Sequence, residues 1–363
     1  MAASDPVDRG WERLEAGDLP GARAALRKAE RDRKNDPEVL CLAGAIAAAD
    51  GEVDAALELL ARAAKADPEY AHPLLQAGEL ELYSRGDPDA ALELAARALA
   101  AAEGEEERAD ALLLKAEAEL EIGCGHDHDS DHDHDHDHDG GHDHSGDNHD
   151  HDAAARATMA EIAGLELRDP IVLTRAGQVY MALDDTRQAE TCFLRAIDED
   201  PGQADAHHGL GLIYEDRGDR EAMVRAWQDT LRLDRAAPPP PWHMTPSEFE
   251  EVAEEAMGEL PDEVLTRLEN VPVLIDDLPS DDLVAEGYDP RLLGLFSGVP
   301  LPEKSHVSGQ RPTIDSVHLY QKNLERQSAD REELADQIRI TVLHETAHFF
   351  GLEDEDLEEL GLG

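Results

Sequence analysis

The residues best suited to chemistry in this 363-residue sequence are two histidines and a glutamate near its end, in the run His344-Glu345-Thr346-Ala347-His348. Two histidines four positions apart lie on one face of a helix, one turn apart, so both imidazoles can bind the same ion. Glu345 lies beside them, where its carboxylate can take a proton from a water molecule that the ion has activated. This spacing predicts a zinc site with a general base next to it.

A glycine after the second histidine indicates where a third ligand comes from. Gly351 follows His348 by three positions and Asp354 follows the glycine by three, which gives the longer pattern H-E-x-x-H-x-x-G-x-x-D. Glycine lets a helix end and the backbone turn back. A carboxylate oxygen can then bind zinc at an ordinary distance. Among the acids at positions 353–356, the spacing favours Asp354 as the third ligand.

The elements that must position these groups are predicted from the pattern around them. Residues 329–350 are typical of one long helix, with a serine or aspartate cap at 328–330. Two short stretches rich in β-branched residues, 271–279 and 315–320, predict strands. The second strand is a candidate edge for binding an extended peptide, and an ordinary buried strand fits it equally well. The segment 292–305 between them has the turn residues of a loop.

Upstream of these strands, the residues 248–260 have the pattern of an amphipathic helix. Ser247 and Glu250 stand three positions apart before its apolar positions, so they predict a capping box at its start. Together the segments predict a small α+β domain over 244–363. Neither His306 nor His318 has a partner at ligand spacing, so we expect both to be surface or packing residues.

Four segments in this region, 244–280, 292–305, 315–326 and 338–361, resemble in their order the small bacterial zincin-like metallopeptidases, the minimal zincins. The resemblance implies a peptidase that hydrolyses a protein or peptide substrate with one catalytic Zn²⁺. It also implies that His344, His348 and Asp354 hold the ion and that Glu345 has the catalytic role. It indicates little about which substrate is cleaved.

The N-terminal two thirds of the chain repeat with a period of 34 residues. Gly10, Gly44 and Gly78 are spaced by 34, and so are Gly177 and Gly211. Aromatic residues recur with the same spacing, as Tyr180 and Tyr214 and as Phe193 and Trp227. In the second repeat, Ala56, Leu60, Ala63 and Pro68 occupy the positions expected from this pattern. These positions resemble the tetratricopeptide repeat, in which small residues let two antiparallel helices pack closely.

The resemblance implies an α-helical tetratricopeptide-type solenoid over residues 1–237, with six helix pairs. Such a solenoid offers a concave face to a protein partner. Four prolines then make a stiff linker, residues 238–243, before the predicted minimal zincin domain at 244–363.

A histidine-rich tract, residues 123–152, interrupts the fourth repeat. Between Cys124 and Asp152 it has ten histidines and eleven aspartates. The tract has no apolar face and its carboxylates repel one another, so we expect a disordered, exposed loop between two helices. Imidazole next to carboxylate suits divalent Zn, Ni, Cu or Co, so we expect loosely bound ions here in addition to the catalytic one. The alternative is that the tract is a solvated low-complexity expansion. The candidate ligands are His126, His128, His132, His134, His136, His138, His142, His144, His149 and His151.

Composition narrows the class of protein. The sequence has 84 acidic and 32 basic residues, which give a formal charge of -52. Such a surface repels nucleic-acid phosphates and anionic membranes, so we expect neither as a partner. The first residues lack the apolar core of a signal peptide and no apolar run is long enough to span a bilayer, so we expect a cytoplasmic protein. The three cysteines, Cys41, Cys124 and Cys192, are scattered, so reduced thiols are expected.

Two functions fit these observations. The first is a zinc-dependent peptidase with a repeat platform that recruits a protein. The second is a non-catalytic repeat adaptor or metal-buffering protein whose zinc site is structural. The presence of Glu345 favours the peptidase, because a structural site needs no general base.

Overall fold

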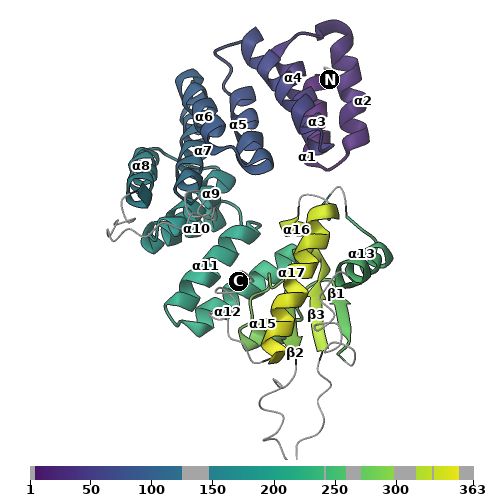
Figure 1. Cartoon of the computed structure of the whole chain (residues 1–363). Coiled ribbons are helices and arrows are strands. Elements are labelled where there is room, and N and C mark those ends of the chain that lie inside the picture. The colour runs from purple at the N-terminus through teal and green to yellow at the C-terminus, as the bar shows by residue number, and fades with distance from the viewer. Residues whose placement is uncertain are drawn as a thin grey trace, which may run out of the picture. The chain divides into compact units, whose positions relative to one another are not determined.

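The computed structural model describes residues 5–124, 147–240, 243–258, 271–297, 316–328 and 331–350. The chain divides into two compact units, Met1–Gly209 and Leu210–Gly363. Within the described residues the first unit is entirely helical, and the second adds a small three-stranded sheet to its helices (Figure 1). The predicted fold class, a tetratricopeptide-like solenoid with a small α+β region after it, is confirmed.

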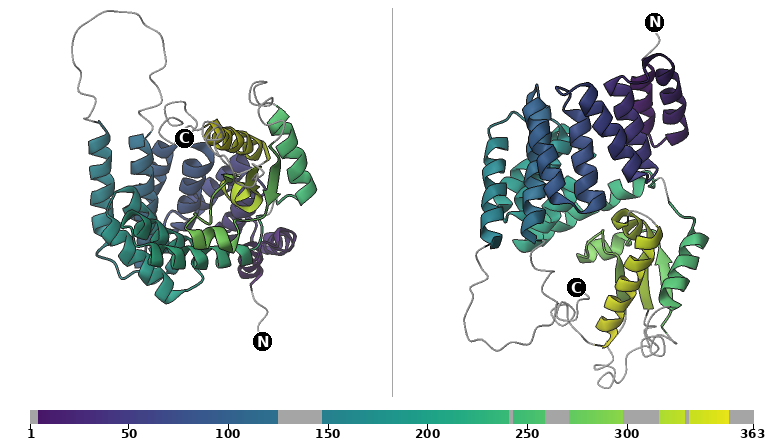
Figure 2. Two further views of the ribbon diagram at one scale, coloured as in Figure 1. Left: turned by 90° about the horizontal axis from the view of Figure 1, so that it is seen from below. Right: turned by 45° about the horizontal axis from the view of Figure 1, so that its top comes forward.

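The first unit consists of antiparallel helix pairs that follow one another along the chain and run side by side (Figure 2). The two helices of a pair contact each other, and the pairs pack in sequence order. The helices are α1 (Pro6–Glu15), α2 (Leu19–Arg33), α3 (Pro37–Ala49), α4 (Val53–Ala66), α5 (His72–Arg85), α6 (Pro88–Ala101), α7 (Glu105–Cys124), α8 (Asp147–Ile162), α9 (Pro170–Ala182) and α10 (Thr186–Glu199), followed by α11 (Ala204–Asp216), in which the unit ends.

Aspartates begin many of these helices. A side-chain oxygen of the N-cap aspartate accepts a hydrogen bond from a backbone amide of the first turn, which would otherwise lack a partner. The caps that do so in the first unit are Asp5, Asp18, Asp36, Asp87, Asp169 and Asp185. Part of the acidic composition therefore stabilises helix starts.

The repeated glycines lie where a large side chain crosses a helix. A Cβ added to Gly177 would lie 2.4 Å from Phe193 Cε1, and one added to Gly211 would lie 2.0 Å from Trp227 Nε1. Real Cβ atoms do not approach other atoms so closely, so the two ring positions of the repeat require glycine opposite them. The predicted equivalence of Phe193 and Trp227 is confirmed.

The histidine-rich tract lies between α7 and α8, which pack against each other as one pair. The helices extend into the predicted insertion at both ends, since α7 continues to Cys124 and α8 begins at Asp147. Residues 125–146, with eight of the ten predicted histidine ligands, lie outside the described residues. His149 and His151 lie on the first turns of α8, and their side chains are likewise outside the description.

The second unit completes α11 and continues with α12 (Arg220–Ala236) and α13 (Pro246–Gly258). It then forms β1 (Val273–Asp276), α15 (Asp281–Glu286), β2 (Gly294–Ser297), β3 (Ser316–Tyr320), α16 (Gln321–Gln327) and α17 (Arg331–Phe350). The strand order is β1-β3-β2, in which β1 is parallel and β2 antiparallel to β3.

The core of this unit lies between one face of the sheet and the helices α13 and α17. Its buried residues include Phe249 and Val252 from α13, Leu319 from β3, and Leu334, Ile338 and Val342 from α17. Full burial of such a side chain is worth about 1.5–3 kcal/mol. The regular spacing of the α17 residues fixes which face of this helix points at the sheet.

The structure corrects three predictions about this unit. The capping box of α13 is made by Thr245 and Glu248, not by Ser247 and Glu250: the Thr245 amide donates to Glu248 Oε2 at 2.8 Å, and the Glu248 amide donates to Thr245 Oγ1 at 3.4 Å. The segment predicted as a loop contains the strand β2. The predicted edge strand β3 is the central strand of the sheet.

The last helix of the repeat pattern packs inside the second unit. Trp227 and Leu231 of α12 form a buried cluster with Leu278 and with Val284 of α15. Arg220 of the same helix donates a hydrogen bond to the Glu286 carbonyl. These contacts of α12 lie within one compact unit that starts at Leu210. The predicted domain limits, 1–237 and 244–363 with a linker at 238–243, stay a prediction.

Candidate active site

Helix α17 positions the predicted catalytic residues. Its buried stripe, Leu334, Ile338 and Val342, continues one turn later into Glu345, which is only 8% exposed. His344 follows on the adjacent face and is half-buried. Because the backbone is helical through Phe350, His344 and His348 are one helical turn apart.

The Glu345 carboxylate lies at the outer edge of the sheet. Its Oε2 accepts a hydrogen bond from the Phe296 amide of β2, with 2.5 Å between oxygen and nitrogen. The Tyr320 amide of β3 donates to the Leu293 carbonyl, and hydrogen-bonded pairs alternate along antiparallel strands. The pair of Phe296 with Val317 is therefore a non-bonded one, and the Phe296 amide points away from β3. Within the described sheet, Glu345 therefore contacts the edge that is formed by β2.

A glycine allows the helix to approach this strand. A Cβ on Gly294 would lie 2.6 Å from Thr341 Cγ2, 3.0 Å from the His318 carbonyl oxygen and 3.1 Å from Glu345 Cγ. The absence of a side chain at this position therefore lets α17 pack closely on β2. The approach places Glu345 beside the strand.

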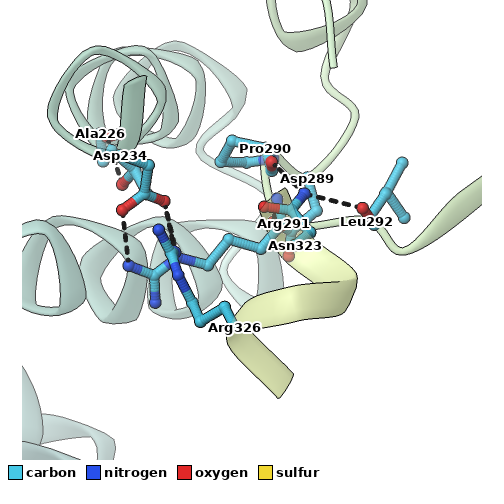
Figure 3. A network of polar contacts seen from close by, with 9 residues as sticks. Ala226, Asp234, Asp289, Pro290, Arg291, Leu292, Asn323 and Arg326 are labelled. Atoms are coloured by element: carbon cyan, nitrogen blue, oxygen red, sulfur yellow. Dashed lines mark hydrogen bonds and ion pairs between the residues drawn. The ribbon is translucent and has the colours of Figure 1, made fainter. Parts of the chain in front are cut away.

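The segment that leads into β2 is held from both sides of Arg291 (Figure 3). Asn323 of α16 donates its Nδ2 to the carbonyl of Pro290 at 2.9 Å and to that of Leu292 at 2.8 Å. The Arg291 amide donates to Asp289 Oδ1 at 2.7 Å. These contacts fix the path of the chain two residues before Gly294.

A row of hydrogen-bonded side chains joins β1 and β3. His318 Nδ1 lies 3.0 Å from Asp276 Oδ2, and His318 Nε2 lies 3.1 Å from Ser316 Oγ. We interpret this row of side chains as a link between the two strands. This agrees with the prediction that His318 is a surface or packing residue.

The predicted metal ligands stay a prediction. No group of three or more His, Cys, Asp or Glu residues within the described part of the chain is placed to hold a metal ion. Two of the three predicted ligands cannot enter such a group, because the His348 side chain and all of Asp354 lie outside the described residues. His306, which was not predicted as a ligand, also lies outside them. The donor chemistry of two imidazoles on one helix face with a carboxylate is that of a zinc site with an open fourth position.

The first unit has a polar cluster that the sequence did not reveal. Arg175 of α9 donates to Glu117 Oε2 of α7 at 2.7 Å and to Glu79 Oε1 of α5 at 3.1 Å. Burial raises the pKa of the neighbouring Asp110 to about 6 against an opposing effect of Arg175. The cluster thus joins helices of three successive repeats.

A pocket of about 320 Å³ lies beside this cluster in the first unit. It is lined by Ala45, Ala48, Leu60, Gln76, Glu79, Leu80, Tyr83 and Ser84. Tyr83 is 63% exposed, which is unusual for so large an apolar ring. An exposed aromatic ring beside a pocket is typical of a protein-binding surface.

Two of the cysteines, Cys41 and Cys192, are buried. Cys41 and Cys192 form no disulfide. Burial raises the pKa of the Cys41 thiol to about 12 and that of Cys192 to about 11. Both therefore remain protonated at neutral pH and are poor nucleophiles and metal ligands.

Comparison with known families matches the two regions to different families. Residues 268–363 match the sequence model of the zincin-like metallopeptidases. Residues 7–71 and 174–239 match the tetratricopeptide repeat. The second of these matches includes α12, which packs in the C-terminal unit.

Comparison with solved structures finds tetratricopeptide proteins. MamA is 20% identical, and the match covers 53% of this chain and 95% of MamA with a TM-score of 0.37. PilW, a type IV pilus biogenesis factor, is 14% identical over 64% of this chain and 93% of its own, with a TM-score of 0.46. YrrB, described as having an unusual peptide-binding site, is 16% identical over 58% and 92%, with a TM-score of 0.35.

A search of curated proteins found no significant match. Among the described residues, no helix has both the length and the apolar composition that a bilayer crossing requires. The chain thus combines tetratricopeptide repeats with a C-terminal region that matches the zincin-like metallopeptidase family.

Proposed function

We propose that the protein is a zinc-dependent metallopeptidase in which His344, His348 and Asp354 hold one Zn²⁺ and Glu345 is the general base. The observation that carries this proposal is the position of the Glu345 carboxylate, within hydrogen-bonding distance of an outward-pointing amide of the edge strand β2. An extended peptide that binds along this edge would place its carbonyl carbon within reach of a water molecule that the base deprotonates.

The edge strand would hold the substrate by main-chain hydrogen bonds. The backbone amide and carbonyl of Gly294 point away from β3, so they would pair with an added strand. The Phe296 amide points the same way but is already bonded to Glu345. This assignment replaces the predicted role of β3, whose central position in the sheet leaves it no free edge.

Bound zinc would supply Lewis acidity, which lowers the pKa of water and polarises a carbonyl. Glu345 takes a proton from the attacking water as the C–O bond forms, and then donates that proton to the leaving amine as the C–N bond breaks. Low exposure of Glu345 keeps bulk water from competing with the substrate for the carboxylate. The Phe296 amide holds Oε2 and so helps to orient the carboxylate.

The first unit would recruit a protein partner or substrate. The pocket beside Tyr83 and the tetratricopeptide fold support this role. The histidine-rich tract would gather divalent metal ions on the same chain as a domain that needs one of them. We propose both roles together with a cytoplasmic location and with no binding of nucleic acid or membrane.

A direct test compares the zinc-loaded protein with Glu345→Gln on denatured proteins and peptide libraries. Cleavage by the first and not by the second is expected. Equal inactivity of both on broad substrates would favour the non-catalytic adaptor. Zinc content is measured in a variant without residues 125–146, in which His344→Ala is expected to lose the tightly bound ion.

A further inference from the structure

We propose that α12 is part of the catalytic machinery of the C-terminal unit, and that Asp234 on this helix is a positioning residue for Glu345. This inference rests on the proposed peptidase function. It gives the last helix of the repeat pattern a role that differs from partner binding.

Asp234 binds two arginines of the zincin-like region at once (Figure 3). Its Oδ1 and Oδ2 accept hydrogen bonds from Arg291 Nη2 at 3.2 Å and from Arg291 Nε at 3.0 Å. Its Oδ2 also accepts one from Arg326 Nη1 of α16, at 2.7 Å. The two bonds to Arg291 form a fork that fixes the orientation of the guanidinium as well as its distance.

The contact is buried, so water does not easily replace it. The Asp234 side chain is 3% exposed and the Arg291 side chain 18%. Burial by itself would raise the pKa of Asp234, but the hydrogen bonds from Arg326 and Arg291 outweigh it and hold this pKa below its ordinary value. Removal of the carboxylate charge would take this partner from Arg291 in a poorly hydrated site, which is more disruptive than the loss of an exposed ion pair. Arg326, at 36% exposed, is better hydrated.

The position of Arg291 determines where the chain enters the edge strand β2. Asn323 binds the carbonyls on both sides of it, at Pro290 and Leu292. The segment therefore cannot absorb a displacement of Arg291 before β2 begins at Gly294. The Phe296 amide, two residues into β2, is the group that binds the Glu345 carboxylate.

A matched control is available on the same helix. Arg235, the next residue, forms a two-bond ion pair with Asp281 at 3.2 and 3.3 Å. The two side chains are 50% and 77% exposed, so water replaces this pair readily. Arg235→Ala removes an ion pair from α12 without touching the chain that leads to Glu345.

The experiment uses the full-length, zinc-loaded protein with Asp234→Asn, Asp234→Glu and Arg235→Ala. Hydrogen exchange is measured on peptides from 289–297 and, for comparison, from α13. In Asp234→Asn, we expect exchange of 289–297 to accelerate about 10-fold or more while α13 stays protected, because only the local contacts open. Asp234→Glu keeps the charge and should recover part of the protection, and Arg235→Ala should match the unchanged protein.

Kinetics provide the second readout. Asp234→Asn should lower kcat by about 10-fold or more, because loss of the Phe296 contact displaces the base. It should also raise KM, because β2 holds the substrate. Asp234→Glu should restore part of kcat. Equal exchange and kinetics in Asp234→Asn and Arg235→Ala would overturn the proposal, and so would accelerated exchange spread evenly over the whole unit. Failure of the unchanged protein to cleave any substrate would count against the peptidase function, while the exchange of 289–297 still decides whether Asp234 holds β2.

Discussion

Glu345 Oε2 and the backbone amide of Phe296 lie 2.5 Å apart, although the two residues are separated by 49 positions in the sequence. This contact joins the long helix α17 to the outer edge of the sheet. It places a carboxylate beside the strand along which an extended peptide can bind. The predictions below test this arrangement and the elements that support it.

Replacement of Glu345 by glutamine should abolish peptide cleavage without loss of zinc. Glutamine is nearly the same size but cannot accept the proton, and loss of a general base lowers kcat by about 100- to 10,000-fold. Cleavage and zinc content are measured together in a variant that lacks 125–146. Glu332→Gln, on the exposed start of the same helix, serves as control. Undiminished cleavage by Glu345→Gln would exclude the assigned role.

Gly294→Ala should reduce both stability and activity. The new Cβ would approach Thr341 Cγ2 to 2.6 Å and the His318 carbonyl to 3.0 Å, and the carbonyl is backbone that cannot easily move. Overpacking of this kind costs about 1–3 kcal/mol. Gly104→Ala is the control, because no atom lies within 4 Å of its new Cβ. Thermal unfolding and kcat are compared, and similar values for the two variants would contradict the close packing of α17 on β2.

Thr245→Ala should destabilise α13, whereas Ser247→Ala should not. The Thr245 hydroxyl donates to Glu248 Oε2 at 2.7 Å and accepts from the Glu248 amide at 3.4 Å at the start of the helix. Loss of an N-cap costs about 0.5–2 kcal/mol. Hydrogen exchange of the α13 amides reports the local effect. A larger effect of Ser247→Ala would restore the capping box expected from the sequence.

Asp110→Asn should stabilise the first unit at pH 7 and have little effect at pH 4. Burial raises the pKa of Asp110 from 3.8 to about 6, so ionisation of this carboxyl opposes folding. Stability is therefore lost as the pH rises from 3.8 through 6, and asparagine removes this loss. The unfolding temperature at the two pH values gives the test, with Asp54→Asn as the exposed control. A gain that is equal at both pH values would show that the charge is not its cause.

Removal of residues 125–146 should slow the recovery of activity when the zinc-free protein is supplied with limiting zinc. The deletion leaves α7 and α8 intact, because α7 ends at Cys124 and α8 begins at Asp147. Many weak, exchangeable imidazole sites on the same chain can capture ions and release them to a single strong site. Recovery of activity is followed over time, and an unchanged rate would reduce the tract to a metal-binding insertion with no role in supply.

Repetition and local spacing account for the parts of the fold that the sequence predicted well. The 34-residue period identified the helix pairs, because a glycine recurs where the chain packs closely against a large side chain. Gly44, Gly177 and Gly211 face Leu60, Phe193 and Trp227 respectively. The strands around Val273 and Val317 and the long helix before Phe350 were also expected. Their β-branched and helical patterns act over a few residues, so no distant contact was needed to find them.

The errors arose where two local solutions compete. Thr245 and Ser247 each stand three residues before a glutamate, and Pro246 suits the first position of the helix that Thr245 caps. The short strand β2 has few β-branched residues, and its pairing with β3 makes it a strand. The order of the strands depends on connections that no local pattern encodes.

The sequence by itself determined which residue types are available for chemistry and that His344 and His348 share one helix face, because helical spacing is a local property. Tertiary structure alone decided that Glu345 meets the Phe296 amide and that Asp234 binds Arg291, a residue 57 positions away. Such contacts form because buried stripes and a missing side chain at Gly294 let helix and strand approach. Packing of this kind depends on the whole unit, so the spacing of residues along the chain does not reveal it.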